Sequence, residues 1–361
     1  MPEAPAPRRI LSGVQPSGKL HLGNYFGAIQ QHIARQDTGE AFYFIADYHA
    51  LTTLREAEAR EADAAQKAGK KTWKSARELL AENVRDVALD YLALGLDPAK
   101  ACFYRQSDVP EVCELAWMLA TVTGMGLLER AHSYKDKVAQ GIAPAVGLFT
   151  YPVLMAADIL IVRSNVVPVG RDQVQHLEMT RDMAGYFNQA YGEVFPLPQE
   201  QLGETPTVPG TDGRKMSKSY GNTIEIFAEG KALKTAVMGI VTDSTPLESP
   251  KNPDTCNVAT LYKLFASAEE VANLAAHYRD PLLNAHEREG KPFGYGHAKQ
   301  LLLKKIDGYF ADARQRRKEL LADPTRVEAV LKAGAAKARA EAVKTMELVR
   351  QRVGMLPRPV A

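Results

Sequence analysis

Two short segments of the chain combine glycine, lysine, serine and histidine in the manner of phosphate-binding loops. The first, residues 13–24 (GVQPSGKLHLGN), follows a predicted strand at residues 9–11 and opens a helix near Leu22. Its glycines let the backbone approach a ligand, and the amide groups and positive dipole end of the helix would face an anion. His21 could donate a hydrogen bond to the same anion. Taken alone, this pattern also fits a simple tight turn between a strand and a helix.

The second segment is residues 215–219 (KMSKS). Its two ammonium groups, with a serine on either side of the second, can wrap a triphosphate and neutralise charge that moves onto a leaving group. Taken alone, it also fits an ordinary surface loop. The presence of both segments in one chain predicts attack on the α-phosphate of a nucleoside triphosphate, with pyrophosphate as the leaving group.

Strand patterns alternate with helical patterns through the first half of the chain. Strands are expected at residues 41–46, 102–106 and 166–169, a further β-like piece at 159–162, and a helix over 147–158. This alternation predicts an α/β fold, namely a Rossmann-like doubly wound parallel sheet followed by a mainly α-helical domain. Ligands of such a sheet bind at the carboxyl ends of its strands.

Beyond Asn222 the strand signals nearly vanish. We therefore predict two domains: residues 1–222, a Rossmann-like catalytic domain with both loops, and residues 223–361, a helical region whose last helix packs back on the catalytic domain. Residues 297–352 contain 14 Lys/Arg and 7 Asp/Glu, which favours a polyanionic partner, although a solvated helical face has the same composition. Helices are expected at residues 228–240, 257–265, 268–277, 297–321 and 325–353.

The composition limits the class of protein. Of 361 residues, 45% are hydrophobic and 24% are charged, as in an ordinary globular protein. The three cysteines form no metal-binding or disulfide pattern and no apolar run is long enough to span a membrane, so we expect a cytoplasmic protein with no membrane partner. Residues 55–74 predict an exposed helical excursion of unknown role. Its segment at 70–74 (KKTWK) would either contact nucleic acid or simply solvate the surface.

The chain resembles the class I aminoacyl-tRNA synthetases. Residues 15–18 (QPSG) with 21–24 (HLGN), and the KMSKS segment, match the two signature motifs of that class. Residues 151–160 (YPVLMAADIL) and 167–176 (VPVGRDQVQH) are similar to signatures of bacterial-type tryptophanyl-tRNA synthetases. The similarity extends from about residue 9 to 352. Two departures are the final Asn24 of the first motif, a change common in the tryptophan branch, and the long excursion at 55–74.

The resemblance implies a two-step reaction. ATP and L-tryptophan would give tryptophanyl-adenylate and pyrophosphate, and the tryptophanyl group would then pass to the 3′ end of tRNA(Trp). Mg²⁺ is expected to arrive with the triphosphate, without a protein metal site of its own. The resemblance also implies a homodimer, an anticodon-reading helical region, and acceptor-stem contacts from the first domain.

The resemblance also assigns the ATP site residue by residue. The catalytic contacts with the phosphates fall to His21, Asn24, Lys137, Lys215, Ser217 and Lys218. Lys137 lies in a charged segment, residues 134–137 (YKDK), where a solvated surface lysine is the alternative. The remaining contacts with ATP would come from Gln15, Pro16, Ser17, Gly23, Gly170, Arg171, Asp172, Val208, Met216 and Ser219, together with Asn24, Lys215, Ser217 and Lys218.

Asp158 is the candidate for recognition of tryptophan. An indole offers one N–H donor and no acceptor, so a buried carboxylate pairs with tryptophan and is left unpaired by phenylalanine. A capping or core aspartate is the alternative, but an unpaired carboxylate is costly in so apolar a run. The resemblance adds Tyr151 and Gln173 at the α-ammonium group, Met155, Val169 and Leu11 against the ring, and Gln15 and His49 nearby.

Three other functions remain possible on the sequence alone. A tyrosyl-tRNA synthetase has a similar fold and also uses an aspartate, although the segments around Asp158 and Gly170 favour tryptophan. A non-catalytic paralogue that binds tRNA would have no reason to keep both phosphate loops. A nucleotidyltransferase for another carboxylate would fail to bind tryptophan.

Overall fold

The computed structural model describes residues 8–131, 145–202 and 207–356, apart from the side chain of Asp172. It divides into two compact units. The sheet unit consists of Met1–Gly18, Gln31–Glu204 and Leu320–Ala361, and the helical unit consists of Lys19–Gln30 and Thr205–Glu319. Among the described helices, none is both long and apolar enough to cross a membrane.

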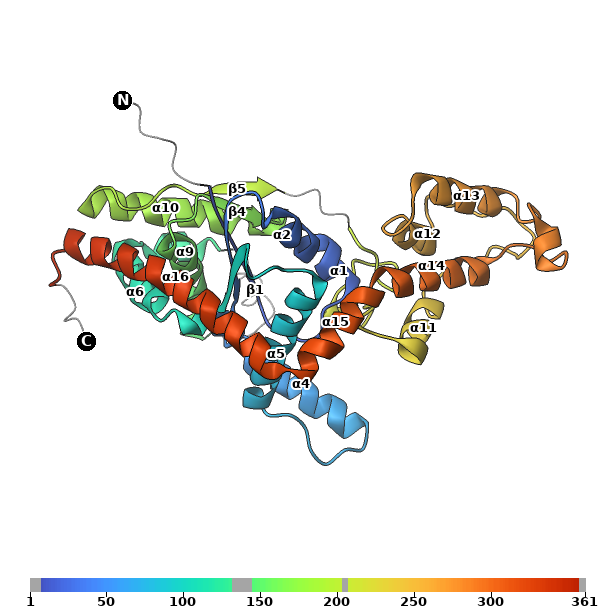
Figure 1. Cartoon of the computed structure of the whole chain (residues 1–361), viewed down its shortest axis with the longest axis horizontal. Coiled ribbons are helices and arrows are strands. Elements are labelled where there is room, and N and C mark those ends of the chain that lie inside the picture. The colour runs from blue at the N-terminus through green and yellow to red at the C-terminus, as the bar shows by residue number, and fades with distance from the viewer. Residues whose placement is uncertain (1–7, 132–144, 203–206, 357–361) are drawn as a thin grey trace, which may run out of the picture. The chain divides into compact units, whose positions relative to one another are not determined.

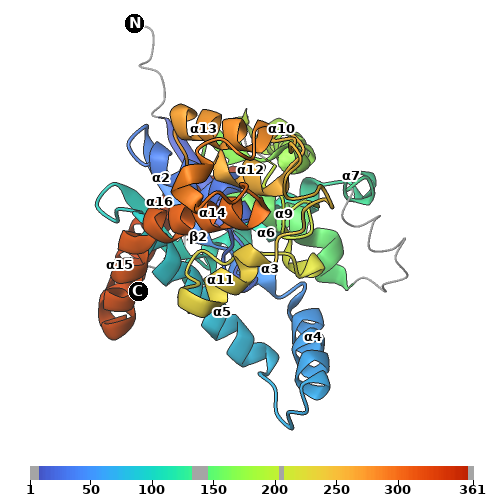
Figure 2. The same ribbon diagram turned by 90° about the vertical axis from the view of Figure 1, so that its right-hand side faces the viewer.

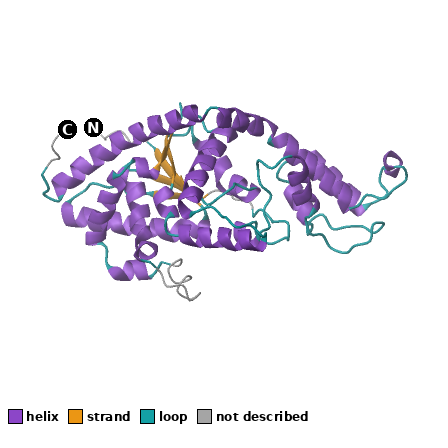
Figure 3. Ribbon diagram, turned by 90° about the horizontal axis from the view of Figure 1, so that it is seen from below, coloured by secondary structure: helices purple, strands orange, loops and turns teal. Residues whose placement is uncertain are grey.

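Five parallel strands form the centre of the sheet unit (Figures 1 and 3). The spatial order β3-β2-β1-β4-β5 reverses between β1 and β4, which is the point where open α/β sheets bind ligands. Strands β1 and β4 are each followed by a predicted site segment. The parallel sheet with this strand order confirms the predicted α/β class. The strands are β1 (Arg9–Val14), β2 (Glu40–Ile45), β3 (Ala101–Arg105), β4 (Val166–Val169) and β5 (Gln199–Leu202).

Helices surround this sheet, and their ends follow local signals. For example, a reciprocal Ser75–Glu78 capping box starts α5, and Gly95 at φ 110° ends it. The helices are α2 (Gln30–Arg35), α3 (Asp47–Ala50), α4 (Leu54–Lys67), α5 (Ala76–Leu94), α6 (Glu111–Val122), α7 (Met125–Glu129), α9 (Val146–Ile161), α10 (Val174–Tyr191) and α16 (Pro324–Arg352), with short 3₁₀ turns η2 (Gln106–Asp108) and η3 (Arg171–Gln173).

Two local predictions for the sheet unit are wrong or incomplete. The β-like piece expected at residues 159–162 belongs to α9, which continues to Ile161. This stretch is fully buried, and a continuous apolar run has the same pattern in a buried strand and a buried helix. The edge strand β5 was not predicted, because three of its four residues (QEQL) are polar and all four are at least partly exposed.

Aromatic rings hold the helical unit together. Tyr25 and Phe26 pack edge-on against Phe265, Tyr309 and Phe310, with ring centroids mostly 5–6 Å apart. The unit contains α1 (Leu22–Asn24), a π-helical turn η1 (Tyr25–Ile29), η4 (Lys218–Tyr220), α11 (Gly230–Met238), α12 (Asn257–Tyr262), α13 (Ala268–Arg279), η5 (Ala285–Arg288), α14 (Tyr295–Tyr309) and most of α15 (Ala311–Ala322). The single helix predicted at 297–321 is therefore two helices.

The compact units do not coincide with the domain boundary predicted at residue 222. The first phosphate loop joins the helical unit from Lys19 onward, because the Leu22 amide donates to the Ile224 carbonyl at 3.0 Å and Lys19 pairs with Glu225. At the other end, Leu320–Ala361 belongs to the sheet unit. The functional division into a catalytic and a tRNA-binding domain stays a prediction.

Helix α16 packs directly on β3. The Cys102 thiol donates to the Gly334 carbonyl at 2.9 Å, and Arg105 makes a bidentate pair with Glu328. A Cβ at Gly334 would lie 1.9 Å from the Phe103 carbonyl oxygen. Only glycine therefore permits this helix to approach the strand so closely.

We predict that Gly334→Ala lowers the free energy of unfolding by at least about 2 kcal/mol, because the helix must move off the strand. Gly185→Ala in α10 is the matched control, since a Cβ there meets nothing within 4 Å. Urea unfolding followed by circular dichroism measures both. Equal stability of the two variants would contradict the close packing of α16.

Candidate active site

A buried carboxylate lies at the carboxyl ends of β2 and β3. Asp158 of α9 is 3% exposed and is bonded by two side chains from the segments that follow these strands. His49 of α3 places Nε2 at 2.8 Å from Oδ2, and the Gln106 amide donates to both oxygens at 2.8 and 2.9 Å. The cluster of Asp158, His49 and Gln106 thus brings together two predicted residues and one that sequence reasoning missed.

Burial raises the pKa of Asp158, and the contacts with His49 and Gln106 oppose that shift. The carboxyl group therefore takes up a proton at a higher pH than an ordinary aspartate. Its hydrogen bonds favour the ionised form, which accepts but does not donate. The cluster is built to present a hydrogen-bond acceptor.

Backbone contacts fix the position of Gln106. Its Oε1 accepts the Tyr48 amide at 3.1 Å, and Asp47 accepts the Ser107 amide at 3.0 Å. The segments after β2 and β3 are therefore bound to each other. In the sequence, Gln106 had only the appearance of a strand end, so nothing local marked it as a partner of Asp158.

Tyr151 lies beside the cluster of Asp158, His49 and Gln106. Its hydroxyl bonds His176, and its ring is edge-on to His49 with centroids 6.3 Å apart. Met155 and Val169 are half-buried against the apolar core that contains the fully buried Leu11. The structure thus places these predicted tryptophan residues on α9, β1 and β4 of one unit, and places Gln173 at the end of η3.

The remaining predicted residues of the sheet unit lie after β1 and β4. Gln15 and Ser17 are exposed, Pro16 is buried, and the Gln15 amide reaches Thr53 at 3.4 Å. Gly170 precedes η3, which contains Arg171 and Asp172. Lys137 lies outside the described residues.

The two phosphate loops meet inside the helical unit. A Cβ at Gly23 would lie 3.0 Å from the His21 ring and 3.4 Å from the Met216 Cβ, so glycine lets the HLGN and KMSKS segments pack together. Asn24 closes the first loop by accepting the His21 amide at 3.1 Å. The Leu22 amide is already bonded to Ile224, so the helix start offers fewer free donors than predicted.

The packing of the HLGN and KMSKS segments lowers the pKa of His21. Burial, and secondarily the charge of Lys218, lowers the pKa of His21 to about 4. The imidazole is therefore neutral at pH 7 and acts as a hydrogen-bonding group without a full charge. Lys215, Lys218 and Ser219 are exposed, so the positive charge stays accessible to a ligand.

Asn222 shapes the KMSKS loop. It is 2% exposed, accepts the Ser217 amide at 2.8 Å, and donates to Asp212 at 2.7 Å and to the Lys215 carbonyl at 3.2 Å. Val208, a predicted ATP contact, is buried and accepts the Met216 amide at 2.9 Å. Sequence reasoning treated Asn222 only as a boundary, because its partners lie on both sides of the loop.

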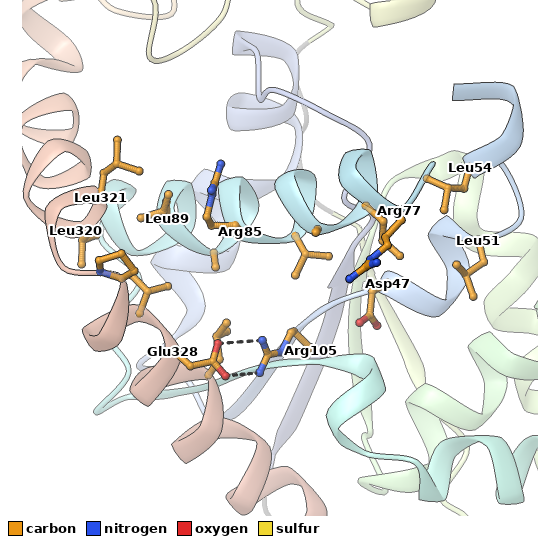
Figure 4. A pocket seen from close by; sticks show the side chains of 17 residues that line it. Asp47, Leu51, Leu54, Arg77, Arg85, Leu89, Arg105, Leu320, Leu321 and Glu328 are labelled. Carbon is orange, nitrogen blue, oxygen red and sulfur yellow. Dashed lines mark hydrogen bonds and ion pairs between the residues drawn. The ribbon is translucent and has the colours of Figure 1, made fainter. Parts of the chain in front are cut away.

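A separate apolar cavity of about 820 Å³ is lined by side chains along α5, at the start of α4 and at the start of α16 (Figure 4). Leu51, Leu54 and Leu89 line it, and the Arg105–Glu328 ion pair lies at its edge. Neither His49 nor Asp158 lines this cavity. We therefore do not assign it to the site around Asp158.

We predict that an NMR titration finds the pKa of His21 near 4 and that Lys218→Ala raises it. Removal of a nearby positive charge favours the imidazolium, but burial, the larger cause, keeps the pKa below 6.5. Lys234→Ala, at an exposed lysine of α11, is the control and should leave the titration unchanged. A wild-type His21 that titrates near 6.5 would contradict the buried loop contact.

Comparison with known proteins agrees with this geometry. The family model of class I tRNA synthetases for tryptophan and tyrosine (W and Y) matches residues 4–306. The chain is 52% identical to the tryptophan–tRNA ligase of Fusobacterium nucleatum over 97% of this chain and 98% of that protein. It is 49% identical to the tryptophan–tRNA ligase of Rhodopirellula baltica over 96% and 99% of the two chains.

The fold is also that of a solved relative. The tryptophanyl-tRNA synthetase of Campylobacter jejuni, in complex with ADP and tryptophan, superposes with a TM-score of 0.83 at 44% identity. The match covers 96% of this chain and all of the other. With the two signature loops packed together and a compensated buried aspartate beside the sheet, these similarities establish that the chain belongs to the class I tRNA synthetases of the tryptophan and tyrosine group, and within it to the tryptophan–tRNA ligases.

Proposed function

We propose that this tryptophan–tRNA ligase binds the indole of L-tryptophan at Asp158 and the triphosphate of ATP at the HLGN and KMSKS loops. The observation that carries the assignment is the buried Asp158 carboxylate, held as an acceptor by His49 and Gln106. The complex of the Campylobacter jejuni relative with ADP and tryptophan supports the choice of both ligands.

The hydrogen-bond count at Asp158 explains selectivity for tryptophan. A carboxylate has about four acceptor positions, and His49 and Gln106 occupy three of them. One position is left for the indole N–H. Phenylalanine lacks this donor and would leave the buried acceptor unpaired, which costs affinity. Met155, Val169 and Leu11 supply the apolar contacts, while Tyr151 and Gln173 hold the α-ammonium group.

In the activation step, a carboxylate oxygen of tryptophan attacks the α-phosphorus of ATP. The new bond is oxygen to α-phosphorus, and the bond from the α-phosphorus to the α,β-bridging oxygen breaks, so negative charge moves onto pyrophosphate. Lys215, Lys218 and Ser217 stabilise that charge, and neutral His21 and Asn24 donate or orient hydrogen bonds at the phosphates. The substrate is the nucleophile, so the protein acts by positioning and electrostatics.

The other ATP contacts follow the same proposal. Lys137 reaches the phosphates, and Mg²⁺ enters as part of the nucleotide, bound by phosphate oxygens and water. The phosphate loops carry donors and cations, which suits contact with the phosphates and not with the metal. The adenosine is held by Gln15, Pro16, Ser17, Gly23, Gly170, Arg171, Asp172, Val208, Met216 and Ser219.

In the transfer step, a hydroxyl of the terminal ribose of tRNA(Trp) attacks the carbonyl carbon of the adenylate. An ester bond forms, the bond from the carbonyl carbon to the phosphate oxygen breaks, and AMP leaves. We further propose that the helical region from residue 223 reads the anticodon, that the enzyme is a homodimer, and that it works in the cytoplasm, where its product is used.

We predict that ATP–pyrophosphate exchange depends on tryptophan and not on tyrosine or phenylalanine. Lys218→Ala should lower kcat by about a hundredfold or more with little change in the KM for tryptophan, because it acts on the leaving group. Asp158→Ala should raise the KM for tryptophan strongly, because it removes the acceptor.

Lys100→Ala is the control, since it removes an exposed lysine at the opposite end of the sheet. Exchange that runs with tyrosine, or an Asp158→Ala variant with an unchanged KM for tryptophan, would refute the assignment of this site.

A further inference from the structure

A helical hairpin extends from the sheet unit between β2 and β3 (Figures 1 and 2). It consists of α4, α5 and the loop between them, residues 68–75. Gly69 at φ 68° turns the chain after α4, and Ser75 caps α5. Helix α4 and this loop contain the excursion predicted at residues 55–74, which the proposed reaction does not use.

The tip of this hairpin is strongly basic. From Lys67 to Arg77, five of eleven residues are lysine or arginine and none is acidic. Lys67 and Lys74 pair with Asp63 and Glu82, but these are surface ion pairs of small energy. Lys70 and Lys71 are exposed and have no ion pair within the described part of the chain. The tip therefore presents an accessible positive field.

An exposed tryptophan stands among these cations. Trp73 is 53% exposed, flanked by Lys71 and Lys74 on a loop that is otherwise small and polar. A large ring in this position is available for stacking on an unpaired base, while adjacent lysines contact phosphates. Helix α4 lacks the broad apolar face that a membrane-surface helix needs, because only Ala65 is buried and seven of its 14 residues are charged.

The root of the hairpin lies at the tryptophan site. His49, which bonds Asp158, is in α3, and α4 begins five residues later at Leu54. The 14 residues of α4 rise about 1.5 Å each, so the tip is about 20 Å from that root. In the transfer step the 3′ end of the tRNA must enter the site, so the nucleic acid within this distance is the acceptor arm.

We propose that the hairpin tip, formed by Lys70, Lys71 and Trp73, binds the acceptor arm of the tRNA. The lysines contact backbone phosphates and Trp73 stacks on a base or on the end of the helix. This inference rests on the proposed function, because it takes the tRNA as the polyanion. It adds a contact that belongs to the transfer step and not to activation.

The test separates the two steps. Lys70→Ala/Lys71→Ala and, separately, Trp73→Ala are compared with Lys100→Ala/Arg163→Ala, which removes two exposed charges next to the amino ends of β3 and β4. ATP–pyrophosphate exchange, which needs no tRNA, should stay within twofold of wild type in all variants. The KM for tRNA should rise about tenfold in the two hairpin variants only, and Trp73→Phe should recover most of the loss.

Salt dependence and fluorescence give independent readouts. The slope of log kcat/KM for tRNA against log salt should fall by about 1 to 2 in the double lysine variant, as expected for two lost phosphate contacts. Trp117→Phe leaves Trp73 as the single tryptophan, and tRNA should quench its emission when free tryptophan is absent. Vesicles of phosphatidylglycerol should leave the emission of Trp73 unchanged.

The outcomes are distinct. A KM for tRNA in the hairpin variants equal to that of the control, or quenching by vesicles and not by tRNA, overturns the proposal. Absence of tryptophan-dependent exchange in the wild type would instead refute the proposed function, whatever the hairpin binds.

Discussion

Compensation of one buried carboxylate is the constraint on which the sheet unit depends. Asp158 is almost fully enclosed, and an ion in that position without partners would cost several kcal/mol. Its partners come from the segments after β2 and β3, and these segments are tied to each other by the Tyr48 and Ser107 amides. Burial of the carboxylate therefore requires the strand ends to be in register, and the same contacts hold Asp158 as an acceptor.

The phosphate loops obey a different constraint, which is close backbone packing. Gly23 leaves room for His21 and Met216, and Asn222 binds the KMSKS loop from inside. The exposed cations thus lie on a loop whose backbone is held by hydrogen bonds from Asn222. Burial keeps His21 uncharged, which leaves the lysines as the carriers of positive charge.

Much of the architecture followed from local pattern. Four of the strands, most of the helices and both signature loops were predictable, because alternation, caps and glycine positions are local signals. What could not be predicted depends on contacts between distant residues. Gln106 and Asn222 gained their roles only from partners far along the chain or across a loop.

Contacts between distant residues also explain why each compact unit is built from separate stretches of the chain. Residues 19–30 join the helical unit through ring packing of Tyr25 and Phe26 against Phe265, Tyr309 and Phe310, which no local pattern reveals. The π-helical turn η1 lies in this segment, where its geometry is set by tertiary packing and not by propensity. The polar sequence of β5 likewise concealed an edge strand.

The most direct test of the account concerns the indole N–H. ATP–pyrophosphate exchange should be measured with tryptophan and with the analogue in which sulfur replaces the indole N–H. This replacement keeps the two fused rings and removes the hydrogen-bond donor. If Asp158 is the acceptor, kcat/KM for tryptophan should exceed that for the analogue by at least about a hundredfold. Equal values for the two substrates would contradict the central role of the buried carboxylate.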